Sequence, residues 1–397
     1  MARKSRKISV GQDSEAHLGM GVLALCFPMS EVKKIIRECG KEEKRVRDLP
    51  ASVAAFYVVA LSLFPGIGYQ DVLGWLISGL RWLGSGMFRI SGKGALSAAR
   101  QRLGETPLRL MHERMVAPAS DIGLTGSFWK GLHLVAIDGS TLALQDTPAN
   151  AAAFGRPSNQ YGTAAYPLAR FAAVAEVGTH IIFAAEIGTY NDSEIKLAER
   201  LIPRLKPGML CLADRLFPGY ELWKAACGSG ASLLWRAKAS LALEKIQTLP
   251  DGSWLAKWYP SRGRSRKSAW HTVRVVEYKL VGVGHSDEIY RLITNVTDAE
   301  FASAEELAML YPQRWEVELS IKENKQILRH GQVTLRSKTP ELVRQEFWGM
   351  LLAHYLIRKM IVQAAVRCKE DPDGISHKAC VEIVKSVQAG PVLSFPP

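Results

Sequence analysis

The segment from Tyr311 to Lys325 has the residue types and spacing of a site that handles both a metal ion and phosphates. Its apolar pattern predicts one helix over residues 311–329. The residues that share one face of this helix are Tyr311, Arg314, Glu318 and Lys325. At about 100° per residue they fall within roughly a 60° arc. One carboxylate thus stands among cations and an aromatic ring. The alternative is an amphipathic helix with a solvated basic face.

Two further acids follow buried strands earlier in the chain. Asp138 ends the predicted strand that begins at Leu132, and Asp214 ends the one that begins at Met209. Between these two acids, the pattern predicts strands over 141–145, 171–177 and 180–186 and a helix over 192–205. Either aspartate alone is commonly a cap or turn residue. Their order, with Glu318 on a later helix, is that of a ribonuclease H-like sheet, whose acids meet at the strand ends.

Three carboxylates that converge at one sheet edge can bind divalent cations. Oxygen ligands suit Mg²⁺ or Mn²⁺ rather than Zn²⁺. Two such ions about 4 Å apart can activate an attacking oxygen and stabilise a leaving one in phosphoryl transfer. The sequence therefore predicts two Mg²⁺ or Mn²⁺ ions held by Asp138, Asp214 and Glu318. No side-chain nucleophile is required for this chemistry.

The segments around these acids resemble those of the bacterial insertion sequence 4-like transposases. All four positions of that family's Y-x2-R-x3-E-x6-K signature are present between Tyr311 and Lys325. The segments 136–140 and 212–217 resemble those that carry the family's first two acids, and residues 46–104 look like its N-terminal domain. The resemblance covers most of the chain.

This resemblance implies a catalytic DDE triad made of the three acids and a cut-and-paste reaction on DNA. It implies that Tyr311, Arg314 and Lys325 bind phosphates of the element's end near the cut. Such enzymes cut by metal-assisted attack of water and use the freed 3′ hydroxyl as the next nucleophile. Related members pass through a hairpin end and flip a base onto an aromatic side chain. The candidates for that role here are Trp254, Trp258 and Trp270.

The predicted fold is a multidomain α/β protein. A ribonuclease H-like mixed sheet with a β-rich insertion is preceded by an all-helical N-terminal domain and followed by a helical tail. The predicted boundaries are 1–125 for the basic helical DNA-binding domain, 126–239 and 306–340 for the two parts of the catalytic core, 240–305 for the insertion and 341–397 for the tail.

Basic residues outside the signature helix are also predicted to bind DNA. A basic, glycine-rich loop over 85–94 precedes a helix, but it does not fit a phosphate-loop pattern because Met87 and Gly94 stand at two required positions. Residues 252–276 carry six bases and no acid, interleaved with aromatic rings, which is typical of a backbone groove with stacking platforms. A solvated hairpin with packing tryptophans is the alternative. The further predicted contacts are Arg215, Lys93, Arg100, Arg102, Arg264, Arg266 and Lys267.

The bulk composition indicates a globular protein with a polyanionic partner. The 397 residues carry a formal net charge of +13, which favours nucleic acid. The six cysteines form no C-x-x-C pair, which predicts reduced thiols. The apolar run 51–64 is too short to span a bilayer, and the N-terminus lacks a secretory pattern. We expect a cytoplasmic, nucleoid-associated protein without a membrane segment.

The predicted function is DNA transposition. The protein is expected to bind the terminal inverted repeats of an insertion sequence and to catalyse metal-dependent cleavage and strand transfer. Its expected partners are double-stranded DNA, as element ends and as target, and a second copy of the chain when bound to DNA. Two other classes stay open: a metal-dependent nuclease without strand transfer, and a non-catalytic DNA-binding regulator.

Overall fold

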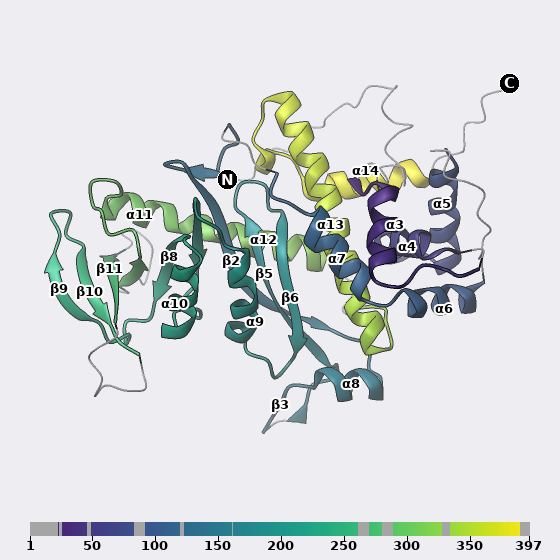
Figure 1. Ribbon diagram of the computed structural model, residues 1–397, viewed down its shortest axis with the longest axis horizontal. Helices are drawn as coiled ribbons and strands as arrows, with labels where there is room; N and C mark the ends of the chain where they lie inside the picture. Colours follow the sequence, from purple (N-terminus) through teal and green to yellow (C-terminus); the bar gives the residue numbers. More distant parts are fainter. Residues whose placement is uncertain are drawn as a thin grey trace.

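In the computed structural model, a long mixed sheet has a helical layer at one end and runs out to the strands β9 (Glu244–Thr248), β10 (Trp254–Trp258) and β11 (His271–Tyr278) at the other (Figure 1). The structure describes residues 23, 26–45, 49–82, 92–119, 123–160, 162–260, 270–279, 289–327 and 334–389. The predicted DNA contacts Arg264, Arg266 and Lys267 lie outside these residues, as does most of the glycine-rich loop over 85–94.

The helical layer is built around one fully apolar helix. The helices before the sheet are α3 (Met29–Glu38), α4 (Ala51–Leu63), α5 (Tyr69–Trp82), α6 (Lys93–Leu103) and α7 (Thr106–Met115). Every residue of α4 is buried, because its side chains are apolar or small on all faces. In the described part of the chain, no helix is long and apolar enough to cross a membrane.

The helical tail is confirmed, and its first helix, α13 (Pro340–Cys368), packs against α4 and α7 rather than standing apart. The close approach requires Gly349, since a Cβ there would lie 2.7 Å from Val58 Cγ1. The remaining tail elements are η4 (Pro372–Gly374) and α14 (His377–Ala389). Because α13 follows the last catalytic element, this packing connects the helical layer to the catalytic core.

The central sheet has the strand order expected of a ribonuclease H-like fold. Its core strands are β2 (Leu132–Ala143), β5 (Leu168–Glu176), β6 (Ile182–Thr189), β7 (Met209–Ala213) and β8 (Ser232–Ala237). They lie in the order β6-β5-β2-β7-β8. Strands β2, β7 and β8 pair in parallel, whereas β5 pairs antiparallel with both β2 and β6. The minor strands are β1 (Phe128–Trp129), β3 (Ser158–Asn159) and β4 (Gly162–Thr163). Adjacent β2 and β7 bring the first two acids to one region of the sheet.

The predicted strand pair 132–138 and 141–145 is wrong in one respect. The structure has a single strand, β2, which runs through Gly139 and Ser140 without a turn. Its pairing with β7 ends at Ile137, whereas its pairing with β5 continues to Ala143. Asp138 therefore lies inside a strand, at the point where the neighbouring strand has ended. Asp138 is therefore close enough to Asp214, which follows β7, for their charges to interact.

The β-rich insertion extends the same sheet. Its strands are β9 (Glu244–Thr248), β10 (Trp254–Trp258), β11 (His271–Tyr278) and β12 (Tyr290–Thr294), and β12 pairs with β8. One of the six bases of this region is structural: Arg274 is fully buried and donates to Ser253 Oγ at 2.8 Å and to the Ala302 carbonyl at 2.7 Å. The insertion is thus held to the core by its sheet, whereas the buried guanidinium of Arg274 joins segments within the insertion.

Helices connect the strands and carry the remaining site residues. They are α8 (Pro148–Phe154), α9 (Glu194–Leu201), η1 (Ile202–Arg204), α10 (Tyr220–Gly228), α11 (Ala304–Leu310), η2 (Tyr311–Arg314), α12 (Trp315–Lys322) and η3 (Glu323–Ile327). The predicted cap of the helix over 192–205 is confirmed, since Ser193 Oγ accepts from Lys196 N. The predicted single helix over 311–329 is instead a 3-10 turn, an α-helix and a π turn in succession, and residues 328–329 lie outside the described part.

Candidate active site

The two aspartates are held by backbone amides beside each other on the sheet. The Gly139 N–H donates to Asp138 Oδ1 at 2.7 Å, and the Leu216 N–H donates to Asp214 Oδ1 at 2.8 Å. Asp214 directly follows β7, and an open hollow of about 430 Å³ lies beside it, lined by Asp214, Arg215, Leu216 and Lys238. A carboxylate that accepts a backbone hydrogen bond keeps a fixed direction, so both acids are oriented before any ligand arrives.

Glu318 reaches the same region from α12, which packs on β2 and β5. Arg314 joins the acids: its Nη2 donates to Glu318 Oε1 at 2.7 Å, and its Nη1 lies 3.9 Å from Asp138 Oδ2. The guanidinium is buried, and its Nε and Nη1 have no hydrogen-bond partner within the described residues. Arg314 is thus the counter-ion of Glu318 and Asp138.

The surroundings of Asp138 disfavour its charged form. Burial raises the pKa of Asp138 to about 7, and the neighbouring carboxylates Asp214 and Glu318 add to that rise. The Gly139 N–H and Arg314 oppose it. Carboxyl groups crowded in this way are stabilised by a cation between them, and their hard oxygen donors fit divalent ions. The residues present therefore fit the predicted metal.

The other two signature residues, Tyr311 and Lys325, bind the strands that carry the aspartates. Tyr311 is buried, and its hydroxyl donates to the Ala213 carbonyl at 3.3 Å, next to Asp214. Lys325 Nζ donates to Ser140 Oγ at 2.8 Å, so the π turn brings this cation to the strand of Asp138. Tyr311 thus holds the end of β7, which differs from the expected phosphate contact.

The remaining predicted contacts fall in different places. Arg215 is exposed at the hollow beside Asp214, and Lys93 and Arg102 are exposed on α6. The position of Arg100 differs from the predicted DNA contact. Arg100 is 6% exposed and donates to Gln345 Oε1 at 2.9 Å and to Ser337 Oγ at 3.1 Å. Its guanidinium therefore joins α6 to the tail rather than facing DNA. The helical spacing of the sequence did not separate this buried arginine from its exposed neighbour.

The three tryptophans of the insertion differ in exposure. Trp258 is 3% exposed and packs on Tyr220 and Trp223, with ring centroids 6.0 and 5.7 Å away, so it cannot receive a flipped base without unpacking the core. Trp254 is half-buried. Trp270 is 43% exposed, and Lys257 Nζ lies 4.7 Å from the centre of its ring. Of the three candidates, Trp270 has the most accessible ring.

A fourth carboxylate, which the sequence reasoning missed, lies next to the triad. Glu194 begins α9, and its side chain occupies the space beside Gly139: a Cβ on that glycine would be 2.6 Å from the Glu194 carboxyl carbon. Burial raises the pKa of Glu194, opposed by Arg170 and assisted by the charge of Asp214. Arg170 Nη1 lies 3.7 Å from Glu194 Oε1. Acids are common in the first turn of any helix, so no sequence signal marked this one.

We expect Glu194→Gln to raise the Mg²⁺ concentration needed for half-maximal cleavage by about tenfold, because outer carboxylates that orient metal ligands have effects of that size. The measurement is the cleavage rate against Mg²⁺ concentration. Glu199→Gln is the matched control, since Glu199 is exposed on the same helix. An unchanged Mg²⁺ dependence in Glu194→Gln would show that this acid has no influence on the site.

The strand order and the two strand-borne aspartates with a helix-borne glutamate define a ribonuclease H-like enzyme of phosphoryl transfer. Family comparisons match the insertion element 4 transposase N-terminal domain over residues 17–113 and the transposase DDE domain over residues 129–356. The transposase InsG for insertion sequence element IS4 of Escherichia coli K12 is 32% identical over 340 residues, which are 85% of this chain and 76% of that protein. The chain belongs to the IS4 family of DDE transposases.

A solved structure that matches the chain is a cryo-EM structure of the piggyBac transposase synaptic complex with hairpin DNA. The match has a TM-score of 0.42 and 12% identity and covers 96% of this chain and 84% of that one. The family match alone supports transposase activity of the DDE type and, with it, dependence on a divalent metal.

Proposed function

We propose that this transposase binds the terminal inverted repeats of its element and moves the element by cut-and-paste cleavage and strand transfer. Asp138, Asp214 and Glu318 are proposed to hold two Mg²⁺ or Mn²⁺ ions. The single observation that carries this proposal is the convergence of the three acids: Asp138 is electrostatically coupled to both Asp214 and Glu318, and Arg314 bridges two of them.

The chain's own residues are proposed to prepare the site before DNA arrives. When bound, the divalent ions would activate the attacking oxygen and stabilise the leaving one. The backbone amides of Gly139 and Leu216 fix the two aspartates, and Arg314 fixes Glu318. In the first step water attacks the phosphodiester and the 3′ oxygen leaves. In strand transfer that 3′ hydroxyl attacks a phosphodiester of the target, and the target's 3′ oxygen leaves.

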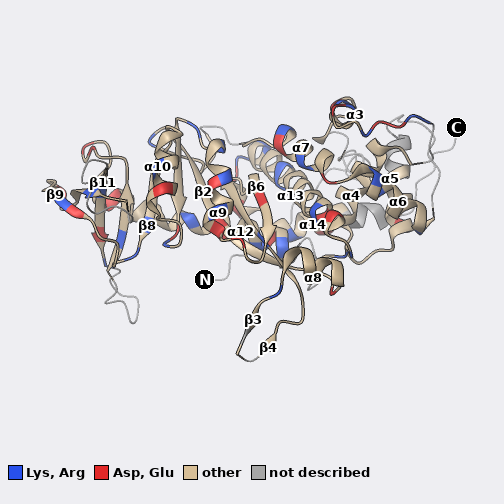
Figure 2. Ribbon diagram, turned by 60° about the horizontal axis from the view of Figure 1, so that its bottom comes forward, with Lys and Arg blue, Asp and Glu red and all other residues tan. Residues whose placement is uncertain are grey.

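The DNA is proposed to follow basic residues that lie on both sides of the triad. Near the cut these are Lys325 and the exposed Arg215 and Lys238. Figure 2 shows further lysines and arginines along the strands and helices of the core. Trp270 is proposed as the platform for an unstacked base, because an exposed ring beside a lysine suits both base and phosphate.

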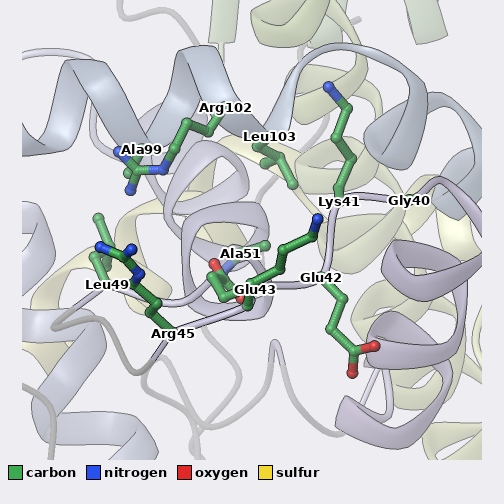
Figure 3. A pocket seen from close by; sticks show the side chains of 11 residues that line it. Gly40, Lys41, Glu42, Glu43, Arg45, Leu49, Ala51, Ala99, Arg102 and Leu103 are labelled. Atoms are coloured by element: carbon green, nitrogen blue, oxygen red, sulfur yellow. The ribbon is translucent and has the colours of Figure 1, made fainter.

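The N-terminal helices are proposed to read the inverted repeat. A hollow of about 400 Å³ between α6 and the 40–51 segment is lined by Lys41, Lys44, Arg45 and Arg102, together with two glutamates. Figure 3 shows Arg102 and Arg45 on one side of this hollow and Lys41 on another. An excess of bases in a concave surface suits a phosphate, so this hollow and the exposed Lys93 are the proposed contacts of this region.

One assay separates the proposal from its alternatives. Purified protein is incubated with Mg²⁺, DNA that carries the element's own ends, and a target plasmid. Nicking followed by joining is the expected result. Nicking without joining identifies a nuclease, and binding without nicking identifies a regulator. Sedimentation with and without end DNA tests the proposed dimer on DNA, and imaging of a tagged copy tests the proposed cytoplasmic, nucleoid-associated location.

Lys325→Ala is expected to weaken binding of end DNA and to reduce the slope of log Kobs against log salt by about one, because one phosphate contact is lost. The measurement is a binding titration at several salt concentrations. Lys322→Ala is the matched control, since Lys322 is exposed at the end of α12, directly before the π turn that carries Lys325. An unchanged slope in Lys325→Ala, or an equal change in both variants, would argue against a phosphate contact specific to Lys325.

A further inference from the structure

A second cluster of possible metal ligands lies where the catalytic helix meets the tail. We name it the histidine cluster: the candidate ligands Glu323, His354 and His377, together with Arg358, which donates to Glu323. Glu323 begins the π turn η3, His354 and Arg358 lie on α13, and His377 begins α14. These three elements contact one another. The cluster therefore joins η3, which follows the helix of Glu318, to α13 and α14. None of its residues belongs to the triad.

Glu323 is an ionised carboxylate in a fixed orientation. Arg358 Nε donates to its Oε2 at 2.8 Å, and Arg358 Nη2 donates to its Oε1. Burial opposes ionisation, but hydrogen bonds with His180 and His354 and the charge of Arg358 hold the pKa of Glu323 well below its usual range. A carboxylate offers about four lone-pair sites, so these two bonds from Arg358 leave positions for a cation.

The two histidines are buried with ring nitrogens that lack partners. His354 is fully buried and His377 is 4% exposed, and their ring centroids lie 5.5 Å apart. Within the described residues, His354 Nδ1 and both nitrogens of His377 have no hydrogen-bond partner. A buried polar atom without a partner is destabilising by about 1–3 kcal/mol. Two such rings therefore lie side by side with nitrogens that no described residue satisfies.

The candidate ligand atoms of the two rings and of Glu323 lie close together. Burial lowers the pKa of His377 to about 3 and also lowers that of His354. A neutral imidazole keeps a lone pair, which is what a metal ion binds. One ligand atom each from Glu323, His354 and His377 lies within 4.8 Å of the other two. Small side-chain shifts bring three such atoms around one ion.

We propose that Glu323, His354 and His377 form a zinc site that is distinct from the catalytic triad. Two imidazoles and one carboxylate are a nitrogen and oxygen set that Zn²⁺ accepts in tetrahedral geometry, with water in the fourth position. Arg358 would orient the carboxylate from outside, as second-layer partners of metal ligands commonly do. The triad, in contrast, has oxygen donors that suit harder ions.

A neighbouring trio, His180, Glu316 and Asp373, has ligand atoms equally close together but is not assigned a metal. Its histidine is already satisfied on both ring nitrogens. His180 Nε2 lies 2.7 Å from Glu316 Oε2, and Arg358 Nη2 donates to His180 Nδ1. Without an available lone pair on its imidazole, this trio is a hydrogen-bonded network that supports the cluster beside it.

The zinc would connect the tail to the catalytic helix. Glu323 follows Glu318 on the same continuous helical segment and begins the π turn that carries Lys325. Binding the ion would fix α14 and α13 against that turn. The bound ion would therefore hold in place the helical segment that presents Glu318 and Lys325.

The test uses the full-length protein. A chelator first removes bound metal, and excess Mg²⁺ is then kept in the buffer so that the triad has its ions. Zn²⁺ is then titrated by calorimetry, and Co²⁺ is added in a parallel sample to record its visible spectrum. We expect a single equivalent of Zn²⁺ to bind, a rise in Tm, and a tetrahedral Co²⁺ spectrum. A folded wild-type protein that binds no Zn²⁺ and shows no tetrahedral Co²⁺ band overturns the proposal.

Two sets of variants locate the ion. His354→Gln with His377→Gln should lose the equivalent of Zn²⁺, whereas Asp138→Asn with Asp214→Asn should keep it. His271→Gln, in the insertion, is the control histidine. Loss of zinc in the aspartate variants with retention in the histidine variants would place the ion in the triad and sink the assignment. Circular dichroism of each variant confirms that it is folded, and the wild-type titration decides the question even where a variant is not.

Discussion

Asp214→Asn is expected to lower the rate of DNA cleavage by about 10³-fold, equivalent to about 4 kcal/mol of transition-state stabilisation. The asparagine keeps the shape of the side chain and can still accept the hydrogen bond that the Leu216 N–H now donates to Asp214 Oδ1. What is lost is one negative charge among the three acids, and with it the affinity for divalent ions. Binding of end DNA should stay within a few-fold of wild type, because no base is removed.

The measurement pairs a cleavage assay on end DNA with a binding titration of the same DNA. Asp146→Asn is the matched control, because Asp146 is an exposed aspartate that forms an ion pair with Arg156 away from the triad. It should cleave at the wild-type rate. Full cleavage by Asp214→Asn would overturn the assignment of the triad. Loss of both cleavage and binding would mean that Asp214 supports the fold instead.

Much of the fold could be predicted because the sequence changes its hydrophobic period where the architecture changes. The apolar runs that end near Asp138 and Asp214 are the adjacent strands β2 and β7, as strand periodicity predicted. The predicted turn at Gly139 and Ser140 was wrong, because glycine and serine are also used where another side chain approaches the backbone closely. Here the Glu194 carboxyl occupies the space that a Cβ on Gly139 would need.

The residues of the site were harder to predict when their role depends on tertiary burial. Arg100 and Arg102 lie on one helix and look alike in sequence, yet Arg100 is buried against Gln345 whereas Arg102 is exposed. Trp258 and Trp270 differ in the same way. Such differences come from elements far apart in the chain, and local periodicity carries no information about them.

The segment over 311–325 brings the signature residues to the site although it is not one regular helix. In a uniform α-helix, the direction of Lys325 would follow from a rotation of about 100° per residue. The structure instead has a π turn over Glu323–Ile327. Lys325 Nζ nevertheless reaches Ser140 Oγ, two residues beyond Asp138 on β2. π turns are frequent at functional sites, and here the extra residue per turn places the cation beside the strand of the first acid.

The second large effect is expected for Arg314, whose buried position favours a role in orienting the acids over a phosphate contact. A phosphate contact would require an accessible guanidinium, whereas Arg314 is buried and donates to Glu318 Oε1 at 2.7 Å. Its Nη1 also lies 3.9 Å from Asp138 Oδ2. We therefore expect Arg314→Ala to slow cleavage by about 100-fold through loss of orientation of the acids, as for other partners of metal ligands.

The salt dependence of end binding distinguishes these roles for Arg314→Ala. If Arg314 positions the acids, the slope of log Kobs against log salt should equal that of wild type while cleavage falls. If it binds a phosphate, the slope should fall by about one, as expected for Lys325→Ala. Arg314→Lys sharpens the comparison, because it keeps the charge but loses the planar fork that holds Glu318. Recovery of wild-type cleavage by Arg314→Lys would show that charge alone suffices and that the geometry of the guanidinium does not orient Glu318.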